Sequence, residues 1–336
     1  MNKKLGTFPG MGLATARIEA ERLLEAIAKG GSAEAVERTF GAVADFWIKN
    51  VAKRKNDSWQ LQQRQLELHV LPAWGERKIT EIRRGHVRDL VEALEGDVLP
   101  NRILTLIKTI FRFALSRDWI DFSPADAIPK PRDEKERDRV LTMMELAWIW
   151  KAARLAGYPF GPFTMLLILT AQRRTEVASM RWRDLDLDAG NWIIRSDNTK
   201  ADRKHLVPLS PLAVQTLKDL PRMGDYVFTS DGESHISGYA SAKAKLDGFV
   251  AGLNGSVEPW RSQDLRRTAA THMVRLGILE TVVGRVLNHA LTGVTAKVYA
   301  LHSYAPEKRQ ALDAWAEDVA KAVDGTSAHP QLRAVS

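Results

Sequence analysis

The chain has 336 residues, enough for about two domains, and its 45% hydrophobic content suffices to bury a core in each. It contains no cysteine, which excludes disulfide frameworks, thiolate zinc sites and cysteine nucleophiles. The 49 Lys and Arg residues outnumber the 41 Asp and Glu residues and give a net charge of +8, so the surface attracts polyanions. Nucleic acid is therefore the leading candidate partner.

Apolar runs in the sequence are too short for a membrane span. The run at 163–170 falls well short of the roughly 18 residues that a spanning helix needs. The N-terminus also lacks the apolar region of a signal peptide. We therefore expect no membrane contact and a cytoplasmic location.

The first predicted domain is helical and covers residues 39–126, where apolar residues recur at three- and four-residue spacing between Pro- and Gly-containing breaks. Residues 127–139 follow, with two prolines, many charges and no apolar period, which is the composition of a solvated linker. A second domain is predicted at 140–323. The last residues, 324–336, lack the apolar spacing to pack and are expected to form a mobile tail.

The second predicted domain is mainly helical with a small β-sheet. Thr142 and Glu145 have the spacing of a capping box, which predicts a helix to about Ala156. Further along the chain the pattern predicts, in order, a helix through Leu169, strands at 191–195 and 204–209 around a polar tip, a helix start at Ser210-Pro211, and helices from about Tyr239 to Val323. The fold class is mainly α with a small β-sheet.

A first cluster of charged residues lies at the end of the second of these helices, in the run Thr-Ala-Gln-Arg-Arg-Thr-Glu at 170–176. An arginine held by a carboxylate can present a planar fork of donors to a phosphate, and Arg173 with Glu176 has that form. Taken alone, the same residues favour an ordinary charge cluster at a helix end. Other segments are needed to decide.

Those segments are Gln-Asp-Leu-Arg-Arg-Thr at 263–268, Leu-Asn-His at 287–289 and Tyr299, ten residues after His289. Together with the run at 170–176 they resemble the motifs of the tyrosine recombinase family, the phage and genomic-island integrases of prophage type. Each motif alone is weak evidence, whereas their shared order and spacing indicate the family.

Two positions depart from the family motifs. The first motif is usually Thr-Gly-x-Arg-x-x-Glu, and here Ala171 replaces the glycine. The second is usually His-x-Leu-Arg-Arg-Thr, and here Gln263 replaces the histidine. A neutral amide can donate a hydrogen bond to phosphate but cannot take up a proton, so the resemblance predicts a slower enzyme.

The resemblance implies a two-domain DNA clamp that consists of a helical, SAM-like core-binding domain and a tyrosine recombinase catalytic domain. Residues 39–126 would be the first and 140–323 the second. More weakly, residues 1–38 are similar to the last turn and helix of the arm-binding domain of prophage integrases and would be its remnant with a linker. The strands that precede that helix in the family have no counterpart in the sequence, so recognition of distal arm sites is in doubt.

The resemblance also assigns roles in a reaction that needs a nucleophile, charge stabilisation and a proton for the leaving oxygen. Tyr299 would attack phosphorus to give a 3′-phosphotyrosyl intermediate and a free 5′-hydroxyl. Arg173 and Arg266 would bind the non-bridging oxygens. No metal or other cofactor is implied.

The remaining roles fall to three side chains. Lys200, preceded by Thr199 at the hairpin tip, matches the general acid for the 5′-oxygen. Glu176 would orient Arg173, and His289 would donate to the phosphate. Without the motifs these residues would be a turn lysine, a surface ion pair and a core or helix-end histidine.

Tyr304 is a rival nucleophile because it lies five residues after Tyr299. On one continuous helix, five residues correspond to about 500° of rotation, which leaves the two side chains roughly 140° apart. Both could not then reach one phosphate, and the family spacing favours Tyr299.

The function predicted is site-specific recombination, in which an integrase cleaves and rejoins the double-stranded DNA of attachment sites to integrate or excise a mobile element such as a prophage. The resemblance implies a homo-tetramer on two duplexes. The main alternative is a DNA-binding protein of the same fold that has lost catalysis through Gln263; a type IB topoisomerase-like enzyme and a helix-turn-helix regulator fit the motifs less well. The sequence leaves open whether an excision factor and a DNA-bending protein take part.

Overall fold

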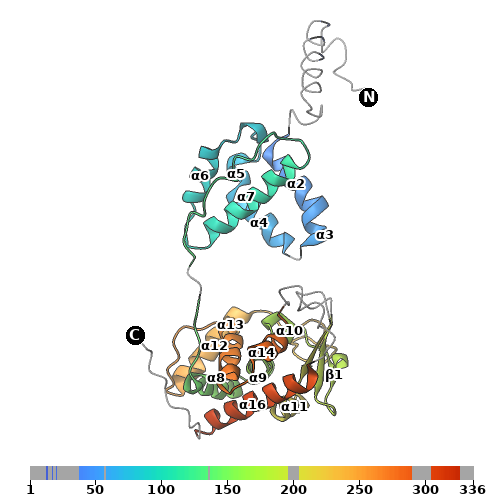
Figure 1. The fold of residues 1–336 in the computed structure, drawn as a ribbon, viewed down its shortest axis with the longest axis vertical. Coiled ribbons are helices and arrows are strands. Elements are labelled where there is room, and N and C mark those ends of the chain that lie inside the picture. Colours follow the sequence, from blue (N-terminus) through green and yellow to red (C-terminus); the bar gives the residue numbers. More distant parts are fainter. Residues whose placement is uncertain are drawn as a thin grey trace. The chain divides into compact units, whose positions relative to one another are not determined.

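The computed structural model describes residues 38–56, 58–134, 137–195, 204–289 and 304–325, with isolated positions near the N-terminus. The chain divides into two compact units, Met1–Glu136 and Arg137–Ser336 (Figure 1). The arm-binding remnant predicted at 1–38 lies almost entirely outside the described residues, as do Lys200, Tyr299 and nearly all of the predicted tail.

The first unit is helical, as the apolar spacing predicts. Its elements in chain order are α2 (Phe40–Trp47), the π-helix η2 (Ile48–Ala52), α3 (Lys53–Lys55), α4 (Trp59–His69), α5 (Leu71–Trp74), the 3-10 helix η3 (Ile79–Glu81), α6 (Arg84–Glu92) and α7 (Leu99–Leu115). The hydroxyl of Thr39 accepts a hydrogen bond from the amide of Ala42 and caps α2. Phe40 packs edge-on against Trp74, with ring centroids 5.4 Å apart, and also contacts Phe111 of α7. These rings bring α2, α5 and α7 around one core.

The segment predicted as a linker, 127–139, makes specific side-chain and backbone contacts near both of its ends. Ile128 is buried in the core of the first unit, and the side-chain amide of Asn101 donates to the carbonyl of Arg132 at 2.8 Å. In the second unit Arg137 forms an ion pair with the buried carboxylate of Asp264 at 2.8 Å. Charged composition alone does not show these contacts, because each depends on a partner that is distant in sequence.

The second unit contains the helices and the small sheet predicted for it. Its elements are α8 (Met143–Ala156), α9 (Phe160–Thr170), α10 (Arg174–Ala178), η4 (Trp182–Asp184), β1 (Leu185–Asp186), β2 (Asn191–Ile194), β3 (His205–Pro208), α11 (Pro211–Lys218), α12 (Tyr239–Gly252), α13 (Ser262–Arg275), α14 (Glu280–Val286) and α16 (Ala305–Val323). The capping box of Thr142 and Glu145 is present at the start of α8, and Ser210 caps α11. Both predicted helix starts are thus confirmed.

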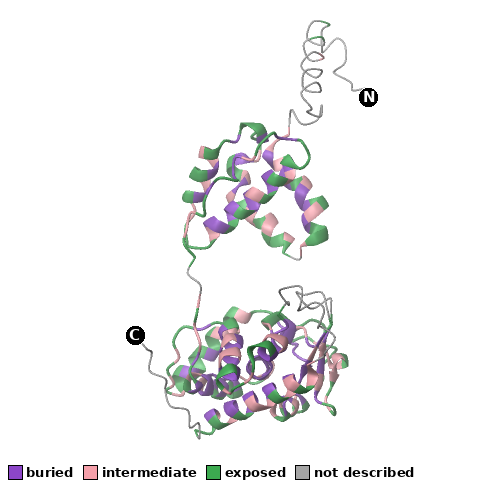
Figure 2. Cartoon of the chain, viewed as in Figure 1, coloured by how far each residue is buried: buried purple, intermediate pink, exposed green. Residues whose placement is uncertain are grey.

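The sheet is antiparallel in the order β1-β2-β3, with Trp192 opposite Val207 and Ile194 opposite His205. The predicted hairpin is confirmed for its two strands, whereas the short strand β1 was not predicted. Each unit has its own buried core, and α9 is buried over most of its length in the second (Figure 2). No helix in the described part of the chain is both long and apolar enough to cross a membrane.

Ala171 ends α9 in the left-handed conformation, with φ 55° and ψ 22°, and its side chain is fully buried. The family motif usually has glycine at this position, and the backbone explains why, since a Cβ is disfavoured there by roughly 1–2 kcal/mol. Replacement of Ala171 by glycine would also remove a buried methyl group, which lowers the free energy of unfolding by about 0.8 kcal/mol.

We predict that Ala171→Gly leaves the free energy of unfolding unchanged or raises it by up to about 1 kcal/mol, because relief of strain exceeds the lost burial. Ala152→Gly is the matched control, because Ala152 is equally buried but lies inside α8. There both effects destabilise, by about 1.5 kcal/mol together. Urea unfolding of the two variants measures the difference, and an Ala171→Gly loss as large as the Ala152→Gly loss would contradict the strain argument.

Candidate active site

Arg173 lies between two helices, immediately before α10, and not at the end of α9 as the sequence pattern indicated. Its guanidinium donates to Glu176 at 2.8 Å, and its backbone amide donates to the other oxygen of the same carboxylate at 2.8 Å. Glu176 is buried, whereas the Arg173 side chain is 29% exposed. The carboxylate therefore holds the arginine in one orientation while part of the guanidinium still faces solvent.

Arg266 lies on α13 and is almost fully buried, with 4% of its surface exposed. It donates through Nη1 to the carbonyl of Ala171 at 2.8 Å and through Nη2 to the carbonyl of Leu287. Burial, followed by the positive charge of Arg173, lowers the pKa of Arg266 to about 10, while Glu176 opposes the shift. The group stays charged at pH 7, so the two arginines and the one carboxylate, which forms its ion pair with Arg173, carry a net positive charge.

His289 follows α14, two residues beyond Leu287. Partial burial, followed by the charges of Arg266 and Arg173, lowers the pKa of the imidazole. The electrostatic influence of both arginines places His289 in the same cluster. The residue before it, Asn288, is left-handed with φ 49°, which turns the chain as α14 ends.

The structure therefore brings together four of the predicted residues, namely Arg173, Glu176, Arg266 and His289. Gln263 is exposed in the first turn of α13, one turn before Arg266 and on a neighbouring position of the same helix face. The described residues do not include Lys200 and Tyr299, so their roles stay predictions.

Gln172 is a residue that the motif analysis did not single out. Its side chain is buried, and its amide donates to the carbonyl of Thr170 at 2.8 Å and to that of Val286 at 2.9 Å. It thereby joins the end of α9 to the end of α14. The sequence shows Gln172 as a polar residue between a buried helix and Arg173, which could have marked it as a site residue. Its partner Val286 could not be predicted, because it lies more than a hundred residues away in sequence.

Tyr304 does not lie within a continuous helix, so the rotation argument made from the sequence is wrong. Its backbone is left-handed, with φ 52°, and α16 begins at the next residue. Its ring packs on the core of the second unit, and the guanidinium of Arg285 lies over the ring at 4.7 Å from its centroid. These contacts, and not helical rotation, disfavour Tyr304 as the nucleophile.

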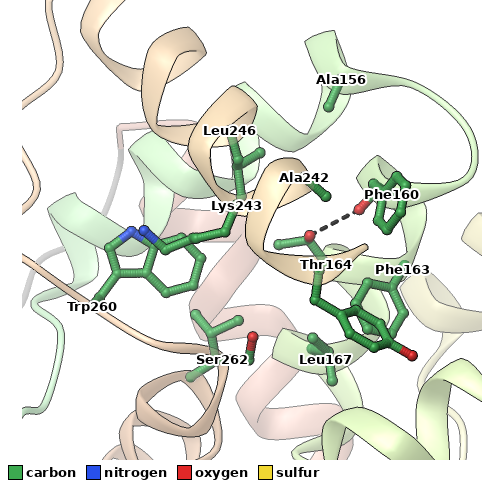
Figure 3. A pocket seen from close by; sticks show the side chains of 12 residues that line it. Ala156, Phe160, Phe163, Thr164, Leu167, Ala242, Lys243, Leu246, Trp260 and Ser262 are labelled. Atoms are coloured by element: carbon green, nitrogen blue, oxygen red, sulfur yellow. Dashed lines mark hydrogen bonds between the residues drawn. The ribbon is translucent and has the colours of Figure 1, made fainter. Parts of the chain in front are cut away.

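A small cavity elsewhere in the second unit is not a substrate site. Its volume is about 30 Å³, and Phe160, Thr164, Lys243 and Trp260 are among the residues that line it (Figure 3). That volume holds about one water molecule. The ammonium of Lys243 lies 4.2 Å from the centroid of the Trp260 ring, which closes one side of the cavity. No group of three or more His, Asp or Glu residues suited to a metal ion occurs among the described residues.

Comparison with known proteins gives the family of the chain. Residues 136–305 match the model of the Phage integrase family, and residues 40–130 match that of the Phage integrase central domain. Prophage integrase IntA of Escherichia coli (strain K12) is 27% identical over 315 residues, which cover 88% of this chain and 73% of that protein. Tyrosine recombinase XerC of Xanthomonas axonopodis pv. citri (strain 306) is 26% identical over 251 residues, covering 67% of this chain and 80% of the relative.

Among solved structures, a lambda integrase tetramer bound to a Holliday junction has a TM-score of 0.64 and 17% sequence identity, covering 85% of this chain and 84% of that one. This likeness shows the fold. The family model covers half of the chain, and its range contains Arg173, Glu176, Arg266 and His289. The chain therefore belongs to the phage integrase family of tyrosine recombinases, enzymes that break and rejoin DNA in site-specific recombination.

Proposed function

We propose that the cluster of Arg173, Arg266 and His289 binds the phosphate at which this recombinase cuts DNA. The observation that carries the proposal is that Glu176 forms an ion pair with Arg173 alone, while the buried Arg266 donates to backbone carbonyls, so one positive charge is left without a carboxylate ion-pair partner within the described ranges. A phosphodiester supplies the missing negative charge. Because the donors are already held in place, they stabilise charge that develops during the reaction without rearranging.

The two arginines serve different purposes in this proposal. Arg266 is buried and has two of its five N–H donors on backbone carbonyls, which fixes its plane. Arg173 is more exposed and is oriented by Glu176, so it can meet a phosphate that arrives from solvent. His289 is neutral at pH 7 and can donate one N–H to a phosphate oxygen.

In the proposed cleavage step, a bond forms between the phenolic oxygen of Tyr299 and phosphorus as the bond from phosphorus to the 5′-oxygen breaks. Lys200 gives its proton to the 5′-oxygen. The tyrosine proton passes to solvent, since the amide of Gln263 cannot take it. Rejoining reverses these steps, and the phosphotyrosyl bond conserves the energy needed, so no nucleotide cofactor enters.

We further propose that the chain acts on double-stranded attachment-site DNA as a homo-tetramer, in the cytoplasm. The tetrameric lambda integrase on a Holliday junction and the lambda integrase dimers on core sites support this assembly by analogy of fold. The net charge of +8 suits a DNA partner. An excision factor and a DNA-bending protein are additional partners in this proposal.

We predict that Tyr299→Phe abolishes covalent attachment to DNA while affinity stays within a few-fold, because only the attacking oxygen is removed. The measurement is trapping on a nicked attachment-site duplex, with a gel-shift titration for affinity. Tyr304→Phe is the control and should still form the adduct. An adduct formed by the Tyr299→Phe variant would show that the nucleophile is another residue.

We predict that Gln263→His raises the rate of single-turnover cleavage by roughly 10²-fold, since an imidazole at this position can accept a proton and the amide cannot. The gain should appear above the imidazole pKa of about 6.5, where the ring is neutral. Cleavage of a suicide substrate from about pH 5.5 to 8.5 measures it. No gain at any pH would show that Gln263 does not limit catalysis.

We predict that in the free protein His289 titrates below the ordinary histidine pKa of about 6.5, because burial and two arginine charges disfavour the imidazolium. Its contribution to stability is therefore retained above about pH 6.5 and lost as the pH falls below it, where the unfolded chain binds the proton first. NMR of labelled histidine, assigned with His289→Gln, gives the midpoint. A midpoint at or above about 6.5 in the free protein would contradict the proximity of the arginines.

A further inference from the structure

The carbonyl of Val286, the last residue of α14, accepts two hydrogen bonds from separate parts of the chain. The side-chain amide of Gln172 donates from the end of α9 at 2.9 Å, and Nε2 of His205 lies 3.1 Å away on β3. A carbonyl only accepts, so Nε2 carries the proton in this contact. Three elements that are far apart in sequence therefore meet at one oxygen.

This junction adjoins the phosphate-binding cluster directly. The next carbonyl, that of Leu287, accepts from Arg266, and His289 follows two residues later. Gln172 is the residue before Arg173. A shift of the α14 end would therefore disturb the partners of Arg266 and the position of His289 together.

His205 is the first residue of β3 and is 6% exposed. It pairs with Ile194 in the last described pair of the β2-β3 ladder. On the next residue, the carbonyl of Leu206 accepts from Lys308 of α16. The root of the hairpin is thus held from two sides, and His205 is the side chain that joins it to α14.

We propose that His205 is a positioning residue that fixes the hairpin relative to the arginines and His289. The inference rests on the proposed function, in which Lys200, five residues before His205, is the general acid. In this role His205 acts through the position of the hairpin and not as a catalytic residue. A misplacement of about 1 Å can lower a rate by about 10²-fold, so one buried hydrogen bond at the hairpin root is enough to matter.

The test compares two DNA substrates that differ in one atom. In the first, the 5′-bridging atom of the scissile phosphate is oxygen, and its departure needs a proton. In the second, the atom is sulfur, which departs as a thiolate unaided because a thiol pKa, about 8.5, lies far below that of an alcohol. A variant that only misplaces the acid is slow on the oxygen substrate and normal on the sulfur substrate. A variant that is partly unfolded is slow on both.

His205→Phe keeps a ring of similar size and removes the donor. We expect single-turnover cleavage of the oxygen substrate to fall by about 10- to 100-fold and cleavage of the sulfur substrate to stay within a few-fold of wild type. His205→Gln, which restores an N–H donor, should recover part of the loss. His272→Phe is the matched control, since His272 is equally buried, in α13 against Trp315, and its ratio of the two rates should equal that of wild type.

Equal losses of His205→Phe on both substrates, or no loss on either, would overturn the inference. Lys200→Ala tests the proposed function separately, because loss of the acid itself must also be relieved by sulfur. If Lys200→Ala is relieved and His205→Phe is not, the inference fails and the proposed function survives. If Lys200→Ala is slow on both substrates, the assignment of the acid fails, whatever His205→Phe shows.

Discussion

The structure of the site depends on the burial of one guanidinium. Removal of a charged group from water is unfavourable unless its donors are satisfied, and Arg266 meets this condition with carbonyls from the ends of two helices, α9 and α14. Those two helix ends must therefore lie close together beside α13, and the side chain of Gln172 joins them. The left-handed backbone of Ala171 follows from the same demand, because it ends α9 where its carbonyl can reach Arg266.

The remaining charges are arranged around this buried cation. Glu176 is also buried, and its two oxygens accept hydrogen bonds from the side chain and the backbone of Arg173, so it holds that arginine in one orientation. Burial, followed by the surplus of positive charge, lowers the pKa of both Arg266 and His289. A site that is unfavourable for cations is by the same electrostatics favourable for a phosphate, which is the group that a DNA-rejoining enzyme must hold.

The two departures from the family motifs have different physical character. Ala171 introduces backbone strain, which burial of its methyl group partly offsets. Its carbonyl still accepts a hydrogen bond from Arg266. Gln263 is exposed and differs chemically from the usual histidine, since an amide donates hydrogen bonds but does not exchange protons at neutral pH. The first should affect stability and the second the rate, so the two substitutions can be studied independently.

The sequence by itself determined the mainly helical class, the helix starts at Thr142 and Ser210, the β2-β3 pairing and the family, because caps, turns and apolar periods act over a few residues. It also predicted Arg173, Glu176, Arg266 and His289 as site residues, and the structure brings these four together. Only the tertiary structure decided that Arg266 is buried between two carbonyls, that Arg137 reaches Asp264, and that Gln172 and His205 meet at Val286. Some of these contacts join residues that are about 80 or more positions apart, and others have a backbone atom as the partner. A contact of either kind leaves no periodic pattern in the sequence from which it could be predicted.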